Sequence, residues 1–375
     1  MLTRENLNTA KRFVVKVGTS TLTHSTGKLN FFRIEKLVRE LSDLANQGKE
    51  VILVTSGAVG VGMDRLGLKE KPKTIPEKQA AAAVGQGILM HTYEKLFGEY
   101  GQVVAQVLLT REDSVKHKRY TNSRNTLLTL LALGVIPVIN ENDVVAVDEL
   151  KIGDNDTLSA MIASIVDADV LIILSDVEGV YTDNPQKNPE AKLLSSITDI
   201  TPEIESLSGD PGSLRGTGGM FTKIQAAKIA INSGVTMFIA SGAREGVIRE
   251  IVSGGEVGTV FLAKENRLQT RKSWLAFGTR IQGAVVVDEG CERAILAGGS
   301  SLLAAGVTAV EGNFDPGNTI RVLAENRREI ARGIVNYNAA EIRKIMGIHT
   351  DQIAGVLGCK PYDEVIHRNN MVVFI

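Results

Sequence analysis

Short apolar, β-branched runs alternate with amphipathic stretches over roughly the first 265 residues. Strands are expected at Phe13–Val17, Glu50–Val54, Val103–Leu108, Val135–Ile139, Val170–Leu174, Thr236–Ile239 and Thr259–Leu262. Helices are expected where Ile34, Leu37, Val38, Leu41 and Leu44 recur, and at Gln79–Tyr100, Thr121–Leu133, Thr157–Val166 and Thr222–Asn232. Apolar strands separated by helices are typical of a sheet buried on both faces, so we expect an α/β fold, a three-layer α/β/α sandwich with a mostly parallel sheet.

The pattern changes after the polar, charged segment Ala263–Lys272, which is typical of a linker or an exposed interdomain helix. Shorter strands are expected beyond it, at Gly283–Val287, Ala309–Glu311, Thr319–Leu323 and Ile330–Val335. Glycines and a Pro316-Gly317 turn separate them. We therefore expect a first domain at residues 1–265, a linker at 266–281 and a small β-rich domain with a helix or two at 282–360.

Composition narrows the class of protein. The 375 residues are 43% hydrophobic with a net charge of −1, which fits packed domains and gives no overall attraction to nucleic acid or to a membrane. The two cysteines, Cys291 and Cys359, and the five scattered histidines suggest neither a disulfide framework nor a zinc site. The N-terminal stretch has no long apolar segment of the secretory kind, so we expect a soluble cytoplasmic protein.

A glycine-rich segment, Arg215–Lys223, precedes the last expected helix of the first domain. Closely spaced glycines let backbone N–H groups approach an anion, and a helix N-terminus with a lysine adds positive charge. This combination suits a nucleotide phosphate tail, although the order of residues is not that of a P-loop. A flexible surface loop before a helix is the alternative.

Two further motifs follow expected strands. Lys16 lies inside an apolar strand, where an ammonium group is costly unless it meets an anion, and Gly18 follows it. The alternative for Lys16 is an edge lysine that reaches solvent. Ser56 follows the second strand and can either bind a substrate anion or simply cap the next helix.

Carboxylates and amides gather in two later segments, Asn140–Asp143 and Gly153–Asp156. Asp143 suits a substrate amino group, Asn140 and Asn155 suit polar substrate atoms, and Asp156 can orient lysines or approach Mg²⁺. The alternative is solvated turns and helix caps. An EF-hand is excluded because the later ligands of its loop are missing.

The expected strand at Val170–Leu174 opens into a long polar loop that begins with Ser175 and Asp176, as loops around a nucleoside do. Two lysines, glycine-rich turns and carboxylates without a histidine or cysteine nucleophile point to phosphoryl transfer. If the acceptor is a carboxylate, no general base is needed, because a group with a pKa of about 4 is already ionised at neutral pH.

Six segments occur in the order found in glutamate 5-kinases: FVVKVGTS, VTSGAVGVG, VIPVINENDVV, KIGDNDTLSA, LSDVEGVYTDNP and GTGGMFTK. The chain resembles this family, part of the amino acid kinase superfamily, over nearly its whole length, and residues 282–360 resemble its PUA domain. The resemblance implies transfer of a phosphoryl group from ATP, with Mg²⁺, to the γ-carboxylate of L-glutamate. The product would be L-glutamyl 5-phosphate, in the first step of proline biosynthesis.

The resemblance also implies roles for residues. Lys16 would bind ATP phosphates, Lys223 would stabilise the transferring phosphoryl group, and Asp156 would organise both lysines. Ser56, Asp143 and Asn155 match glutamate-binding positions, and Asn140 lies in the same loop as Asp143. The residues expected at ATP are Lys16, Gly18, Ser175, Asp176, Thr217, Gly218, Gly219, Met220, Phe221, Thr222 and Lys223. No residue is assigned to a metal.

Members of the family are commonly homo-oligomers inhibited by proline, and a glutamyl phosphate reductase is the implied recipient of the product. Two other interpretations stay open: a different acid or phosphate kinase of the superfamily, and an RNA-binding or RNA-modifying protein, since PUA domains occur there. Acidic and basic side chains are close to balanced in residues 282–360, which favours neither RNA nor a membrane as a partner. A local basic patch at Arg327, Arg328 and Arg332 stays open as an alternative, and a solvated β-turn and strand face is favoured over it.

Overall fold

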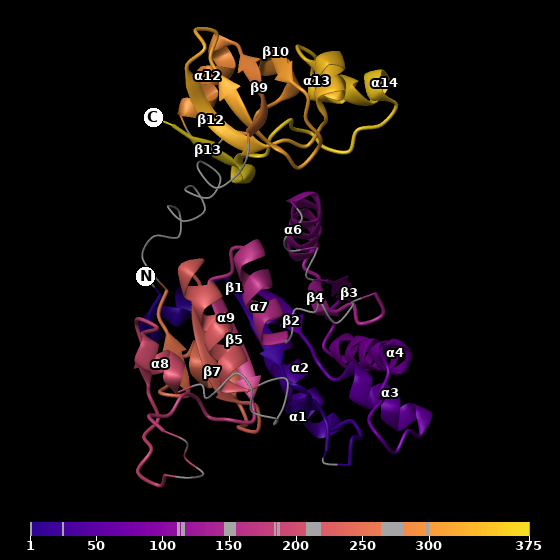
Figure 1. Ribbon diagram of the computed structural model, residues 1–375, viewed down its shortest axis with the longest axis vertical. Coiled ribbons are helices and arrows are strands. Elements are labelled where there is room, and N and C mark those ends of the chain that lie inside the picture. Colours follow the sequence, from indigo (N-terminus) through magenta and orange to yellow (C-terminus); the bar gives the residue numbers. More distant parts are fainter. Residues whose placement is uncertain are drawn as a thin grey trace. The chain divides into compact units, whose positions relative to one another are not determined.

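The computed structural model describes residues 2–24, 26–110, 113, 117–145, 155–183, 185, 188–207, 219–263, 281–297 and 300–374. The chain forms two compact units, Met1–Arg267 and Leu268–Ile375 (Figure 1). The expected linker at 266–281 lies almost wholly outside the described residues, so the predicted domain boundaries stay a prediction.

An eight-stranded sheet organises the first unit, in the order β3-β4-β2-β1-β5-β7-β8-β6. Its strands are β1 (Arg12–Val17), β2 (Glu50–Val54), β3 (Val104–Leu109), β4 (Ile136–Glu141), β5 (Val170–Ser175), β6 (Ser196–Ile197), β7 (Thr236–Ser241) and β8 (Thr259–Phe261). Neighbouring strands are parallel except for the antiparallel pair β7 and β8. The expected mostly parallel sheet is confirmed, and its carboxyl ends bring the sequence motifs to one edge.

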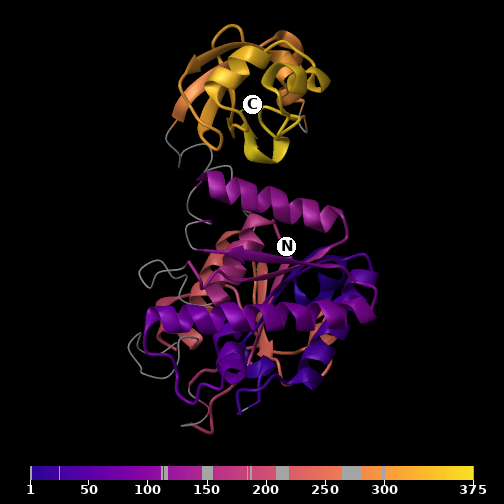
Figure 2. The ribbon, with the colours of Figure 1, turned by 90° about the vertical axis from the view of Figure 1, so that its right-hand side faces the viewer.

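Helices cover both faces of this sheet (Figures 1 and 2). One apolar core joins the sheet to α2 (Phe31–Asn46), α3 (Ala58–Leu66), α4 (Ile75–Glu99) and α10 (Val247–Val252). The core on the opposite face joins it to α6 (His117–Ala132), α7 (Asn155–Ile165), α8 (Pro202–Ser206) and α9 (Met220–Asn232). The short helix α1 (Thr19–Leu22) follows β1 directly. The three-layer sandwich is therefore confirmed.

The start of α4 differs from the expectation by one turn. The sequence pattern predicts a helix from Gln79, but α4 begins at Ile75 because Thr74 and Glu77 form a capping box around Pro76. The Thr74 side chain accepts a hydrogen bond from the Glu77 backbone, and the Glu77 carboxylate accepts one from the Thr74 backbone. Apolar periodicity alone misses this first turn, because the residues that start the helix there, Thr74 and Glu77, are polar.

Helices α3 and α4 touch backbone to backbone at two glycines. A Cβ atom on Gly62 would lie 1.8 Å from the Ala81 carbonyl oxygen, and one on Gly85 would lie 1.8 Å from the Ala58 carbonyl oxygen. No side chain larger than hydrogen fits at such a distance, so both positions require glycine for close approach. The contact fixes the start of α3, which follows the Ser56 motif, against the middle of α4.

We expect Gly85→Ala to lower the free energy of unfolding by about 1–3 kcal/mol, because overpacking outweighs the better helix propensity of alanine. Gly87→Ala is the matched control in the same helix, since its Cβ would meet nothing within 4 Å. That control should gain about 0.5–1 kcal/mol. Urea unfolding of both variants measures the difference, and equal stabilities would contradict the close contact.

The second unit is built on a five-stranded sheet in the order β10-β9-β11-β12-β13. Its strands are β9 (Ile281–Val287), β10 (Val307–Gly312), β11 (Thr319–Leu323), β12 (Glu329–Ile334) and β13 (Met371–Val373), and its helices are α12 (Glu289–Leu296), α13 (Ala339–Ile345) and α14 (Ile353–Leu357). The pair β9 and β11 is parallel, and the other pairs are antiparallel. The four expected strands are confirmed, while β13 was not expected.

Among the described residues, no helix is long and apolar enough to cross a membrane.

Candidate active site

The first turn of α7 lies between two groups of polar side chains at the carboxyl ends of the central strands. Asn155 and Asp156 are its first two residues. Asp156 contacts residues of β1 and α9, and Asn155 contacts residues that follow β2 and end β4. Two consecutive residues thus join two clusters with different chemistry.

The first cluster consists of Asp156, Lys16 and Lys223. The Lys16 Nζ lies 2.6 Å from Asp156 Oδ1, and the Lys223 Nζ lies 3.1 Å from Asp156 Oδ2. The Thr222 hydroxyl also donates to Oδ2, at 3.0 Å. Asp156 is fully buried, and the two lysines are 5% and 3% exposed. The three ionised side chains together carry one net positive charge, inside the protein.

Burial would raise the pKa of the Asp156 carboxyl, but the charges of Lys16 and Lys223 and their hydrogen bonds outweigh it and hold that pKa below its usual value. The carboxylate is therefore ionised at neutral pH. An ammonium group has three N–H donors, so a lysine can bind Asp156 and a second anion at the same time. The arrangement is suited to an anion that arrives beside both lysines.

The second cluster is a network of amides and hydroxyls. The two N–H groups of Asn155 Nδ2 are shared among three acceptors: the Thr55 carbonyl oxygen at 2.8 Å, Ser56 Oγ at 2.9 Å and Asn140 Oδ1 at 3.0 Å. The Asn140 Nδ2 in turn donates to Gln86 Oε1 of α4, at 2.8 Å. Ser56 and Asn140 are 9% and 2% exposed, so these two side chains are almost fully buried. All side chains of the network are polar and uncharged.

The residues expected at ATP are only partly described. Gly18 donates its backbone N–H to the Leu174 carbonyl oxygen at 3.3 Å, which places it beside Ser175, the last residue of β5. The Ser175 hydroxyl donates to Asp176 Oδ1 at 2.9 Å. Gly219 is the N-cap of α9, and Met220, Phe221, Thr222 and Lys223 form its first turn. Thr217 and Gly218 lie outside the described residues.

Two of the simpler alternatives are wrong. Lys16 does not reach solvent, because its ammonium group is paired inside the protein. Ser56 does not cap α3, since the N-cap is Gly57, with a φ of 95°, and Ser56 instead accepts a bond from Asn155. Asp143 is the first residue of the turn after β4 and is half-buried. Its expected role, binding of a substrate amino group, stays a prediction.

Gln86 is a polar residue of this site that sequence reasoning missed. It lies within the apolar run of α4, one residue after Gly85. A lone glutamine among alanines, valine and glycines was the available signal, but a helix pattern does not show which strand end the side chain will face.

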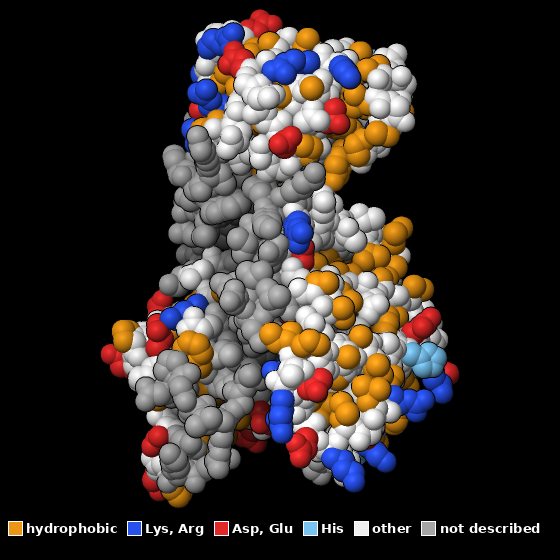
Figure 3. All heavy atoms as spheres, turned by 45° about the vertical axis from the view of Figure 1, so that its right-hand side comes forward, with side chains coloured by type: hydrophobic (Ala, Val, Ile, Leu, Met, Phe, Trp, Pro, Cys, Tyr) orange, Lys and Arg blue, Asp and Glu red, His pale blue; other side chains and the backbone are white. Residues whose placement is uncertain are grey.

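The three arginines of the alternative basic patch in the second unit are each paired with a glutamate, which agrees with the favoured prediction of a solvated turn and strand face. Arg327 pairs with Glu311, Arg328 with Glu292 at 2.8 Å, and Arg332 with Glu329. Cationic and anionic side chains lie interspersed on the visible face of this unit (Figure 3). Paired arginines do not make the cationic footprint of an RNA-binding surface.

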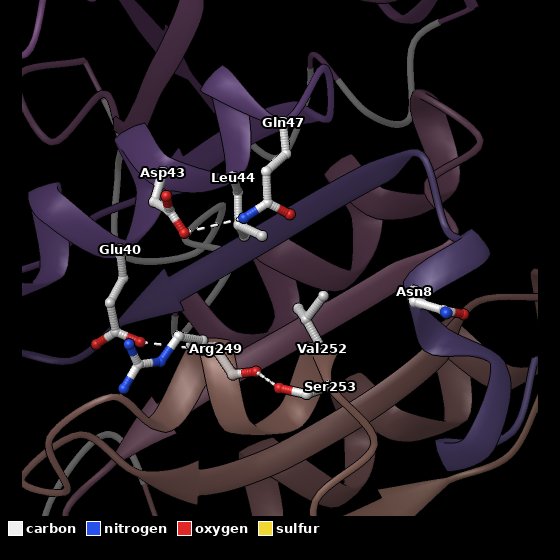
Figure 4. A pocket seen from close by; sticks show the side chains of 8 residues that line it. All are labelled: Asn8, Glu40, Asp43, Leu44, Gln47, Arg249, Val252 and Ser253. Carbon is white, nitrogen blue, oxygen red and sulfur yellow. Dashed lines mark hydrogen bonds between the residues drawn. The ribbon is translucent and has the colours of Figure 1, made fainter.

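A pocket of about 240 Å³ lies away from both clusters, between α2 and α10 (Figure 4). Its lining includes Glu40, which accepts hydrogen bonds from the backbone of Ile248 and Arg249. Burial raises the pKa of the Glu40 carboxyl. α2 and α10 cover the face of the sheet opposite α7 and α9, so this pocket does not belong to the clusters at Asp156.

Comparison with known proteins agrees with this architecture. The family model for the amino acid kinase family matches residues 11–241, and that for the PUA domain matches residues 283–357. Glutamate 5-kinase of Moorella thermoacetica is 57% identical over 98% of this chain and 97% of its own. That of Carboxydothermus hydrogenoformans is 53% identical over 99% of each chain. In fold, carbamate kinase from Giardia lamblia bound to AMP-PNP matches 68% of this chain and all of its own, with a TM-score of 0.50 and 18% identity.

The large, mostly parallel sheet and the family model together define a protein of the amino acid kinase type. The chain belongs to the amino acid kinase family, and it carries a PUA domain. Its curated relatives at 45–57% identity are named glutamate 5-kinase.

Asp156→Asn is expected to lower the free energy of unfolding at pH 7 by about 3–5 kcal/mol, because it leaves two buried lysines without their carboxylate. The folded-state pKa of Asp156 is depressed, so its contribution is present above about pH 4 and is lost as the pH falls through the folded pKa. The difference between variant and parent should therefore shrink below about pH 4. Urea unfolding at several pH values measures it.

Asp64→Asn serves as the control, because Asp64 is an exposed carboxylate on α3. It should change stability by no more than about 0.5 kcal/mol. A difference between Asp156→Asn and the parent that stays constant down to about pH 3 would contradict the depressed pKa.

Proposed function

We propose that this site transfers a phosphoryl group from ATP to the γ-carboxylate of L-glutamate and forms L-glutamyl 5-phosphate, the first step of proline biosynthesis. The observation that carries the proposal is the buried Lys16–Asp156–Lys223 cluster beside the Asn155 network. The names of the full-length relatives support the substrate.

The lysine cluster accounts for the nucleotide side of the reaction. Phosphoryl transfer needs positioning and neutralisation of charge on the phosphate oxygens. Lys16, at the end of the central strand β1, binds phosphate oxygens of ATP. Lys223, in the first turn of α9, stabilises the phosphoryl group in transfer, and Asp156 holds the two ammonium groups in place. Preorganised charges of this kind need not move during the reaction.

The amide network accounts for the acceptor side. Ser56, Asn140 and Asn155 hold polar atoms of glutamate, and Asp143 pairs with its ammonium group. The γ-carboxylate is ionised at neutral pH and attacks the γ-phosphorus without a general base. ADP leaves with the electrons of the broken P–O bond, so no proton has to be moved on the acceptor.

Magnesium accompanies ATP in phosphoryl transfer and neutralises charge on its phosphates. Asp156 does not fit as a ligand of that ion, because both of its carboxylate oxygens already contact ammonium groups. The structure therefore favours the lysine-orienting role of Asp156 over the magnesium-binding one. No group of three or more metal-binding side chains occurs in the described part of the chain. We expect Mg²⁺ to be held by phosphate oxygens and water, as it often is.

Hydroxylamine trapping tests the proposed reaction. The protein is incubated with ATP, Mg²⁺ and L-glutamate, and in parallel with L-aspartate and N-acetylglutamate. Hydroxamate from glutamate alone is the expected result. Product from another acid would support kinase activity but contradict glutamate as the substrate. Product from no acid would contradict phosphorylation of a carboxylate.

Lys223→Ala should lower kcat about 100-fold or more and change the KM for glutamate little, because the charge acts on the transferring group. Steady-state kinetics measures both constants. Lys228→Ala is the control on the same helix, because Lys228 pairs with Glu205 at the surface. A parental kcat in Lys223→Ala would remove Lys223 from the reaction.

Asp143→Ala and Asp143→Asn should both raise the KM for glutamate about tenfold or more, since each removes the charge that faces the substrate ammonium. The KM for ATP should stay at its parental value. If the KM for glutamate does not change in either variant, Asp143 does not bind the ammonium group.

Homo-oligomer formation, feedback inhibition by proline and transfer of the product to a glutamyl phosphate reductase also belong to the proposal. Their support is the similarity to glutamate 5-kinases over nearly the full length of both chains. A labile acyl phosphate as product further supports rapid use by a second enzyme.

A further inference from the structure

We propose that Gln86 of α4 is a positioning residue for glutamate, which acts by fixing the orientation of the Asn140 and Asn155 amides. This inference rests on the proposed function of the Asn155 network. Gln86 itself is half-buried and reaches the network through one contact, from Asn140 Nδ2 to Gln86 Oε1, at 2.8 Å.

Contacts with the backbone identify which atom of each asparagine amide is the oxygen and which is the nitrogen. The Glu141 backbone N–H can only donate, and it lies 2.9 Å from one atom of the Asn140 amide, which must therefore be Oδ1. The Thr55 carbonyl can only accept, so the Asn155 atom 2.8 Å from it must be Nδ2. With these two orientations given, Asn140 presents its Nδ2 to α4, and the facing atom of Gln86 must be the acceptor Oε1.

The chain of hydrogen bonds continues from Asn140 through Asn155 to Ser56, which belongs to the proposed glutamate site. Asn140 Oδ1 accepts from Asn155 Nδ2, and the same Nδ2 donates to Ser56 Oγ. Because Ser56 Oγ accepts this bond, its own hydroxyl hydrogen points elsewhere and can donate to a carboxylate. Gln86 supplies the acceptor at the start of this chain. Without it, the buried Asn140 Nδ2 loses its partner, and a rotated Asn140 would present N–H groups to Asn155 and to the Glu141 N–H.

The position of Gln86 is itself fixed by packing. Its neighbour Gly85 lies against the Ala58 carbonyl of α3, at a distance that admits no side chain. A second bond, 2.8 Å long, joins the buried Tyr93 hydroxyl of α4 to Thr55 Oγ1. α4 therefore supports the glutamate side of the site, while the lysines lie on β1 and α9.

Gln86→Met and Gln86→Glu separate positioning from packing. Methionine fills a similar volume without the acceptor, whereas glutamate keeps an acceptor at the same reach. We expect Gln86→Met to raise the KM for glutamate about tenfold, as the loss of a buried hydrogen bond does. The KM for ATP should remain within about twofold of the parental value, because the lysine cluster is untouched. Gln86→Glu should restore most of the affinity for glutamate.

Two control variants test whether the effect is specific to Gln86. Gln102→Met removes a surface amide that donates to Asn46 Oδ1, just beyond the end of α4, and should change neither KM. Tyr93→Phe removes the hydrogen bond between α4 and Thr55 Oγ1 and should lower the midpoint of thermal unfolding without a comparable rise in the KM for glutamate. A rise of the same size in Tyr93→Phe would mean that any weakening of α4 suffices, and would overturn the specific role of Gln86.

Ser56→Ala and Asn155→Ala distinguish failure of this inference from failure of the proposed site. If both raise the KM for glutamate and Gln86→Met does not, the site stands and the role of Gln86 is overturned. If neither changes it, the proposed glutamate site fails, and the inference fails with it. A rise in Gln86→Met that Gln86→Glu does not reverse would also overturn the acceptor role.

Discussion

The carboxylate of Asp156 is the group on which the arrangement of this site depends. It is fully buried, and each of its oxygens contacts the ammonium group of a different lysine. The cost of taking a charge out of water is large, and only opposite charges in close contact offset it. Lys16 on β1, Asp156 on α7 and Lys223 on α9 therefore require one another, and together they fix the distance between a central strand and two helices.

The start of α7 connects this charged cluster to a neutral one. Asp156 faces the lysines, and the preceding residue, Asn155, donates to the Ser56 hydroxyl and to the Asn140 amide. A donor of a phosphoryl group and a carboxylate acceptor need adjacent sites of different polarity, the first cationic and the second rich in hydrogen-bond donors. Because the two residues are consecutive, the two sites cannot move apart while the first turn of α7 is intact.

α4 supports this arrangement from the other side of β2. Its contact with α3 excludes any Cβ at Gly62 and Gly85, so two helices approach at backbone distance where α3 begins. The helix then reaches the site through Gln86 and the Tyr93 hydroxyl. These two polar side chains connect the packing of α4 to the geometry of the site.

The sequence by itself determined the layered fold and singled out most of the polar side chains that gather at the carboxyl ends of the strands. Apolar runs and helical spacing indicate directly which residues are buried. The motifs at strand ends come together because parallel strands share one carboxyl edge of the sheet. Only the tertiary structure decided that Lys16 is paired rather than solvated, that Gly57 rather than Ser56 caps α3, and that Gln86 joins the network. The pairing of Lys16 and the contact of Gln86 depend on atoms from segments far apart in the chain, and Ser56 is turned toward Asn155 by the same kind of contact. Periodicity along one segment carries no information about such contacts.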